Sequence, residues 1–379
     1  MPKLWIPRRF FIKGAAASLA APYADAAIFS FDANGAIDPW TNLDGRLNAP
    51  SGTPRLSTLL NGYHPVGTTD GRYYLGTGGG FQPPWRVAGV DYAVGYPDNI
   101  VLKDPASISL AGVNVNTRTK TIDITEDDVT LDGYDFTQYI INTDRSRTKI
   151  SNSRFRFTSF RNVGSRGFID GRRSKNLTIS YCSFDGTNMN VSDNRAVLCS
   201  DDFIMEYCNI ANMVNDGIDC NSATYGGKFY IHHTLFNEVA VAGSGHGDPI
   251  QFVGVNTANW DVQFYFNTMV QHQQVNQSNG CYVDAGGGAT MANPLLHHNT
   301  VVTYDSGPGH GGAPGNPGGW AYSYCFRPSH VGATVTGGSL NDNWCDASGC
   351  IEWRISDSSF PPTMTIKNNM NMVDGTVLT

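Results

Sequence analysis

The sequence contains few charged residues and few segments that favour helix. Asp, Glu, Lys and Arg make up 16% of the 379 residues, and the formal net charge is −7. This mild acidity provides no basic footprint, so nucleic acid is not an expected partner. Runs of Ala, Glu, Lys and Leu are missing after the N-terminus, whereas 42 residues are Gly. The composition therefore predicts an all-β chain of short strands joined by many turns.

The cysteines and histidines lack the spacing of a zinc site. The eight cysteines include no Cys-x-x-Cys pair, and no second Cys/His pair stands at ligand spacing. Cys182 and Cys208 instead fall on one position of the repeat described below, where they are expected to stack as small buried side chains. Cys345 and Cys350 bracket a short loop and are the best candidates for a disulfide.

The first 26 residues have the order of an export signal. A twin-arginine-like motif, Arg8 to Lys13, precedes an apolar run from Gly14 to Ala21 and a small-residue cleavage site at Ala24 to Ala26. The apolar run is too short to cross a bilayer, so no membrane span is expected in the mature chain. This order favours a twin-arginine-type signal over an ordinary basic N-terminus and predicts a periplasmic or secreted protein.

Two further regions follow the signal. Residues 27–104 are expected to form an N-terminal arm and cap, because residues 29–82 are rich in Gly, Pro and aromatics but show no period. Residues 83–104 are expected to lead into the first coil through a strand at Val90 to Val94. Residues 105–379 form the repeat domain, with loop insertions.

The repeat is anchored on a short strand with an inward aliphatic residue, followed three residues later by a small or amide residue. The base period is in the twenties of residues, roughly one coil of short strands, with variable insertions at one corner. The anchors are residues 128–136, 148–155, 177–184, 203–210, 229–236, 262–269, 294–301, 339–345 and 364–371. The residues predicted to stack are Tyr134, Ser153, Cys182, Cys208, Thr234, Asn267, Asn299, Asn343 and Asn369. The four late Asn predict an amide ladder.

This pattern resembles the right-handed parallel β-helix of the pectate-lyase-like superfamily from residue 128 to the C-terminus, with no single family matched. Its members include pectate and alginate lyases, polygalacturonase-type hydrolases, alginate epimerases and phage tailspikes. The resemblance implies an all-β solenoid with a polysaccharide substrate, and it does not decide the reaction.

A second strand in each coil carries the candidate site. Its rows align as 167–170, 196–199, 216–219, 248–251 and 281–284, with an aliphatic third residue directed into the core and the fourth directed outward. The outward residues are then Asp170, Cys199, Asp219, Gln251 and Asp284. Neighbouring coils lie about 4.8 Å apart, so Asp219 and Asp284 are expected at about twice that distance, as in inverting hydrolases. Asp216 and Asp219 are also candidate Ca²⁺ ligands.

Basic and aromatic residues near this row suggest lyase chemistry. His246 lies in the Gly-rich loop before Asp248 and is a candidate base. Arg172, Arg173 and Arg195 are candidates to neutralise a uronate, and Tyr225 or Tyr282 to protonate the leaving oxygen. The pairs His232–His233 and His297–His298 lie in the anchor strand and are expected to be packing or surface residues.

Three functions follow. The first is a lyase that cleaves a uronate-containing polysaccharide by β-elimination, using His246, Asp248, Asp219, Tyr282 and Arg195, with Asp170, Arg172, Arg173, Gln251, Asp284 and Tyr225 binding substrate. The second is a glycoside hydrolase that uses paired aspartates. It resembles polygalacturonases in its aspartates and in Gly245-His246-Gly247, but lacks their Asn-Thr-Asp and Arg-Ile-Lys motifs. The third is a glycan-binding solenoid without catalysis.

Overall fold

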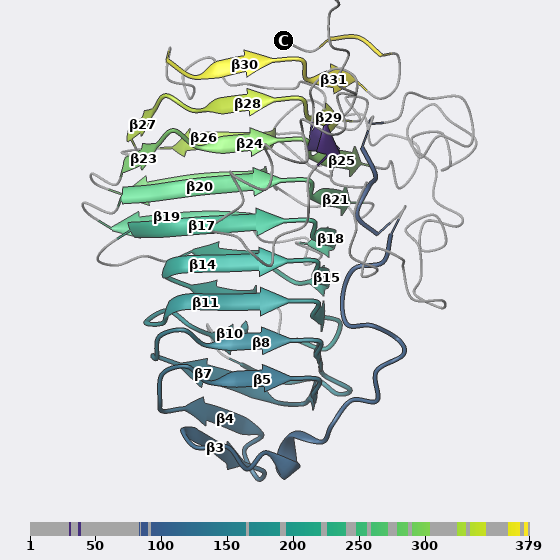
Figure 1. Cartoon of the computed structure of the whole chain (residues 1–379), viewed down its shortest axis with the longest axis vertical. Helices are drawn as coiled ribbons and strands as arrows, with labels where there is room; N and C mark the ends of the chain where they lie inside the picture. The colour runs from purple at the N-terminus through teal and green to yellow at the C-terminus, as the bar shows by residue number, and fades with distance from the viewer. Residues whose placement is uncertain are drawn as a thin grey trace, which may run out of the picture.

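The protein is a right-handed parallel β-helix (Figure 1), as the sequence predicts. The structure is a computed structural model. It describes residues 30–31, 37–38, 83, 85–89, 92–163, 167–189, 195–220, 226–239, 248–255, 259–271, 279–286, 290–303, 324–330, 334–345, 363–371 and 375–377. Strands stack coil upon coil into three long sheets, and a separate antiparallel pair is formed by β1 (Ser30–Phe31) and β2 (Ile37–Asp38).

Each coil contributes one strand to each sheet in turn. The first sheet contains β3 (Val113–Asn116), β4 (Thr121–Ile124), β7 (Ile140–Thr143), β10 (Gly167–Asp170), β13 (Arg195–Cys199), β16 (Asp216–Cys220), β19 (Ile250–Val255), β22 (Asn279–Gly286) and β26 (Tyr324–His330). The second contains β5 (Thr130–Asp132), β8 (Lys149–Ser151), β11 (Lys175–Ser180), β14 (Asp201–Glu206), β17 (Gly226–His232), β20 (Asn259–Tyr265), β24 (Leu295–His297), β28 (Ser339–Asn341) and β30 (Thr365–Lys367), with β23 (Thr290–Ala292) and β27 (Thr334–Thr336) beside them. The third contains β6 (Asp135–Thr137), β9 (Arg154–Arg156), β12 (Ser183–Asp185), β15 (Asn209–Met213), β18 (Leu235–Val239), β21 (Thr268–Gln271), β25 (Thr300–Thr303), β29 (Trp344–Cys345) and β31 (Met370–Asn371).

The core is a set of in-register stacks that run along the solenoid. In the second sheet, alternation directs one aliphatic or aromatic residue per coil inward: Leu131, Ile150, Ile179, Met205, Ile231, Phe264, Leu296 and Leu340. All of these are buried, and burial of each such side chain contributes about 1.5–3 kcal/mol. In the third sheet, the rings of Phe155 and Phe184 stack with centroids 4.7 Å apart. Every predicted anchor overlaps a strand of the second sheet, so the predicted repeat is confirmed.

The turn between the second and third sheets holds the predicted ladder. Residues just before the ladder adopt positive φ, including His233 (53°) and His298 (56°), a conformation that costs about 1–2 kcal/mol per non-Gly residue. The backbone N–H of Asn267 donates to Asn299 Oδ1 at 3.0 Å, and Asn299 N–H donates to Asn343 Oδ1 at 3.0 Å. These amides are fully buried, and their bonds offset the unfavourable turn conformation. The amide ladder is confirmed.

A segment from Trp85 to Lys103, which we call the strap, packs along the outside of this turn (Figure 1, dark blue). The Trp85 ring lies 5.0 Å from the His298 ring, and its Nε1 donates to Thr300 Oγ1 at 3.3 Å. Gly95 N–H donates to the Tyr207 carbonyl at 2.8 Å. The strand expected at Val90 to Val94 is wrong for the described residues there, which form one isolated bridge between Ala88 and Tyr92. Its apolar side chains face the solenoid instead, because Tyr92 and Val94 are buried.

The cysteines behave partly as expected. Cys182 and Cys208 are buried, and Cys182 N–H contacts Cys208 Sγ at 3.5 Å, which confirms their stacking. Cys345 is buried and forms no disulfide, so the predicted bond to Cys350 is wrong. Its place in β29, in register with Val301, directs it into the core as a small apolar side chain. Cys350, His310, the signal segment and most of the arm lie outside the described residues.

Candidate functional site: a buried arginine–aspartate cluster

The register of the first sheet corrects the predicted outward row. Ile169, Ile218 and Ile250 are buried on the inward side, as predicted, but the residue of β13 in register with Ile169 and Ile218 is Val197 and not the expected Leu198. The outward positions, however, are occupied by Asp170, Leu198, Asp219, Gln251 and Tyr282. Leu198 replaces Cys199, and Tyr282 replaces Asp284, which pairs instead with Val253. The error has a physical source: Ala196, Val197 and Leu198 are all apolar, so composition did not identify which one faces the core.

Three side chains meet where β13 lies beside β16: those of Arg195, Asp216 and Asp219. Asp248, just before β19, adds its backbone N–H, and we call these four residues the Arg–Asp cluster. Register brings Arg195 opposite Asp216. One guanidinium nitrogen, Arg195 Nη2, lies 3.1 Å from Asp219 Oδ2 and 3.5 Å from Asp216 Oδ2. The backbone N–H of Asp248 donates to Asp216 Oδ1 at 3.0 Å. Three coils of the solenoid therefore contribute to one polar centre.

The cluster is buried, and burial controls its protonation. Asp216 and Asp248 are 0% exposed, Asp219 4% and Arg195 7%. Burial raises the pKa of Asp216 to about 7, with Arg195 opposing the rise and the charge of Asp219 adding to it. Asp216 therefore holds a proton close to neutral pH, while Asp219 forms the shorter ion pair with Arg195. Two neighbouring carboxyl groups thus have different environments, as acid–base chemistry requires.

Asn215 was not singled out from the sequence. Its Nδ2 donates to Asp216 Oδ2 at 2.9 Å, so Asp216 accepts bonds from Asn215, from Asp248 N–H and from Arg195. The sequence signal that could have identified Asn215 was its position directly before Asp216, the first residue of β16. Leu198 was also missed. It lies on the outward row between Asp170 and Asp219, yet is only 1% exposed.

Other predicted residues lie outside the cluster. Arg172 binds Asp170 in a two-point ion pair, with Nε–Oδ1 at 2.9 Å and Nη2–Oδ2 at 2.7 Å. Arg172 and Arg173 are exposed on the turn after β10. Gln251 is half-buried and pairs in register with Asp219. His246 and Tyr225 lie outside the described residues, and for Tyr282 and Asp284 the structure defines the strand position in β22.

The predicted calcium site can be compared with the described side chains. Across the parts of the chain that the structure describes, no group of three or more His, Cys, Asp or Glu residues is arranged to hold a metal ion. Arg195 supplies a positive charge between Asp216 and Asp219.

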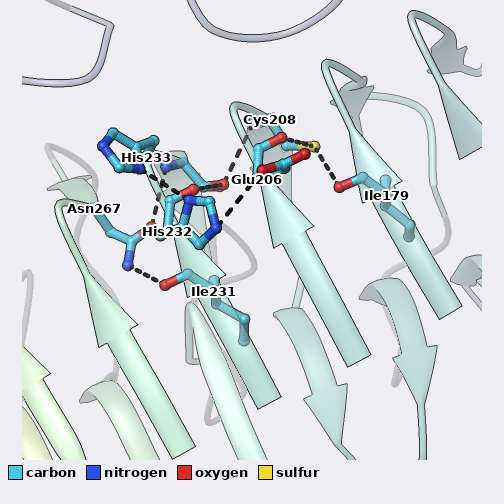
Figure 2. Close-up of polar contacts among 8 residues, drawn as sticks. Ile179, Glu206, Cys208, Ile231, His232, His233 and Asn267 are labelled. Atoms are coloured by element: carbon cyan, nitrogen blue, oxygen red, sulfur yellow. Dashed lines mark hydrogen bonds and ion pairs between the residues drawn. The ribbon is translucent and has the colours of Figure 1, made fainter. Parts of the chain in front are cut away.

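A second polar group lies at the turn beneath the strap (Figure 2). His232 Nε2 is 3.7 Å from Glu206 Oε2, and the Nδ1 atoms of His232 and His233 are 2.9 Å apart. Burial lowers the pKa of His232 to about 4 and that of His233 well below its usual value, so both rings are neutral at neutral pH. The His233 ring stacks between those of Tyr207 and Phe266, at 4.8 and 5.2 Å. These contacts agree with the packing role expected from the sequence.

The chain matches no protein-family model, no curated protein and no solved structure. Its class is therefore defined by its own geometry, which is that of a parallel β-helix protein with a buried Arg–Asp cluster on its first sheet. Among the described residues, no helix is long and apolar enough to cross a membrane.

Proposed function

We propose that this protein is a carbohydrate-active enzyme that cleaves an extracellular polysaccharide at the Arg–Asp cluster. The observation that supports this most directly is the pair Asp216 and Asp219, which share one guanidinium nitrogen and of which Asp216 has a pKa raised by burial. Cleavage of a glycosidic bond uses one carboxyl group as an acid and another as a base or nucleophile. The raised pKa of Asp216 fits the acid, and Asp219, which forms the shorter ion pair with Arg195, fits the second role.

Hydrolysis fits the described residues better than the β-elimination expected from the sequence. Arg195 contacts two aspartates, so protein carboxylates already balance its charge. It is therefore a poor candidate to neutralise a uronate, and its role is to hold Asp219 ionised beside Asp216. In hydrolysis, Asp216 would protonate the glycosidic oxygen, and Asp219 would activate water or attack the sugar.

β-Elimination is the second candidate, because two arginines lie exposed on the same sheet. Arg172 and Arg173 follow β10 on the turn beside Asp170. Both arginines are exposed and can contact an acidic sugar, although Arg172 already forms an ion pair with Asp170. In that case the substrate would be a uronate polymer, with His246 as the base and Tyr282 as the acid, as the sequence suggests, and Ca²⁺ as a candidate cofactor.

The test is a digest of neutral and acidic polysaccharides, with Ca²⁺ and with chelator, followed in two channels. Reducing ends report all cleavage, and ultraviolet absorbance reports the unsaturated ends that only elimination forms. We expect reducing ends without absorbance, and a loss of roughly 10²–10⁴-fold in Asp216→Asn and Asp219→Asn. Absorbance that rises with reducing ends would instead establish the lyase.

The matched control is Asp123→Asn. Asp123 occupies the same outward row of the first sheet, far from the cluster, and is exposed, with Asn142 Nδ2 bonded to it at 2.7 Å. It should retain full activity. If the folded Asp216→Asn and Asp219→Asn variants were as active as Asp123→Asn, the cluster would be only structural. Binding to the same polysaccharides without any cleavage would identify a glycan-binding solenoid.

A further inference from the structure

Two cysteines face each other on neighbouring coils in the core of the first sheet. Cys199 is the last residue of β13 and Cys220 the last residue of β16, and the two are in register. Both are present as thiols and are 0% exposed. Their Sγ atoms lie 3.3 Å apart. The two sulfurs are therefore in direct contact inside the core.

The backbone already holds this pair at a separation that suits a disulfide. Residues in register on neighbouring parallel strands lie about 4.8 Å apart. This is inside the range of about 4.4–6.8 Å between the Cα atoms of disulfide-bonded cysteines. The sulfurs must approach by about 1.2 Å to reach the bond length of about 2.05 Å. Small rotations of the two side chains can supply this movement, so the strands need not shift.

The other stacked pair, Cys182 and Cys208, is arranged differently. Cys208 Sγ accepts the backbone N–H of Cys182 at 3.5 Å. It also contacts the carbonyls of Glu206 at 3.3 Å and Ile179 at 3.8 Å (Figure 2). Cys182 Sγ contacts the Ser180 carbonyl at 3.4 Å. Each sulfur of this second pair is thus engaged with backbone groups, and the pair provides an internal comparison.

From this geometry we propose that Cys199 and Cys220 form a disulfide when the chain meets a disulfide oxidant. The bond closes one whole coil into a covalent ring, because β14 and β15 lie between the two cysteines and β16 completes the coil. It also fixes β13 to β16, the two strands that bring Arg195 opposite Asp216. The proposal does not rest on the enzymatic function.

The reaction is a thiol–disulfide exchange with a low-molecular-weight disulfide, R–S–S–R. One protein thiol loses its proton and attacks a sulfur of R–S–S–R, which releases one R–S⁻ and leaves a mixed disulfide. The second protein thiol loses its proton and attacks the protein sulfur of that mixed disulfide, which releases the other R–S⁻. The two cysteines together lose two electrons and R–S–S–R gains them. The two protons pass to the released thiolates.

Burial decides when this exchange can occur. Burial raises the pKa of the Cys199 thiol, although its contact with Cys220 opposes the rise. A buried, protonated thiol is a poor nucleophile. The exchange therefore requires an open core, as during assembly of the coils or during local opening.

The test exposes the full chain to excess oxidised glutathione, or to a dithiol reductant, just below its thermal midpoint, where the coils open transiently. Each sample is then cooled, unfolded and alkylated, and its peptides are mapped by mass. We expect a peptide that links Cys199 to Cys220 in the oxidised sample and none in the reduced one. Before unfolding, the oxidised protein should keep the circular dichroism spectrum of the folded chain. Its thermal midpoint should be higher by about 5 °C, because a disulfide constrains the unfolded chain.

Two variants separate this bond from other thiol chemistry. Cys220→Ala removes one partner, so it should abolish both the link and the rise in midpoint. Cys182→Ala is the matched control, because it removes a buried cysteine of the other pair and should keep both. Mapping of the unaltered chain decides the proposal even if either variant fails to fold.

Three results would overturn the proposal. The first is the absence of a peptide that links Cys199 to Cys220 after oxidation. The second is an equal yield of a link between Cys182 and Cys208, which would show that the contact between the sulfurs does not select the pair. The third is a linked protein that has lost the folded spectrum, because the solenoid would then not accommodate the bond.

Discussion

The Asn ladder leads to a quantitative prediction at Asn299. Asn299 Oδ1 accepts the backbone N–H of Asn267 at 3.0 Å, and its Nδ2 donates to the Phe264 carbonyl at 2.9 Å and to Asn343 Oδ1 at 2.9 Å. Replacement by Leu keeps the branched shape of the side chain but removes these three bonds and a fourth, which Asn267 Nδ2 donates to Asn299 Oδ1 at 3.2 Å. In the variant, the buried N–H of Asn267 loses its acceptor.

The size of the loss follows from these contacts. A buried donor left without an acceptor costs about 1–3 kcal/mol, and each further lost hydrogen bond about 1 kcal/mol. Leu recovers part of this through its apolar surface, so we expect Asn299→Leu to lower the free energy of unfolding by about 2–4 kcal/mol. Asn299→Thr should cost only about 1 kcal/mol, because Thr234 holds the same position and its Oγ1 accepts Cys208 N–H at 3.4 Å.

The assay is denaturant unfolding followed by circular dichroism, with the midpoint and slope compared among variants. Asn114→Leu is the matched control, because Asn114 is exposed on β3 and should change stability by no more than about 0.5 kcal/mol. If Asn299→Leu were as stable as Asn114→Leu, or if Thr were no better than Leu, the ladder would not stabilise the solenoid and the reasoning would be refuted.

Three other perturbations have defined outcomes. Because burial raises the pKa of Asp216, its protonated form stabilises the fold at low pH, and this stability is lost as pH rises from about 4 through about 7. Asp216→Asn should flatten that part of the curve of stability against pH. An unchanged curve would contradict the raised pKa. The pKa of His232 is lowered, so stability is lost as pH falls from 6.5 toward about 4; His232→Gln should reduce this loss, measured by thermal unfolding at each pH. Trp85→Ala should release the strap to proteolysis between Trp85 and Lys103 while the coils stay folded, and equal protection in both proteins would argue against a packing role for the Trp85 ring.

The repeat made most of the fold accessible to prediction. The anchors could be aligned because each coil places one aliphatic residue inward and one small or amide residue at the turn, and Asn267, Asn299 and Asn343 differ little in environment. The path of the strap could not be predicted, since Trp85 and Tyr92 pack on residues far away in sequence and carry no period. The alternation at Val90 to Val94 placed apolar residues on one face, and Tyr92 and Val94 are indeed buried. The described residues there do not form the expected strand.

The candidate site was predictable in its residues and not in its geometry. Asp216 and Asp248 stood out as acidic residues at equivalent positions of successive coils, Asp219 as an acidic residue of the outward row, and Arg195 as a nearby cation. The meeting of Asp216 and Asp219 at one guanidinium nitrogen depends on a register shift of one residue in β13, which the apolar run Ala196 to Leu198 concealed. The protonation of Asp216 depends on burial, which no local pattern reports.

The strap also has a consequence for the order in which the molecule assembles. Trp85 leaves the ribosome early, yet its partner Thr300 lies 215 residues later in the chain. Synthesis proceeds from the N-terminus, so the surface that receives Trp85 does not exist until almost the entire solenoid has been made. Contacts this distant in sequence close slowly. The strap is thus synthesised before any coil but docks among the last, when the solenoid is nearly complete.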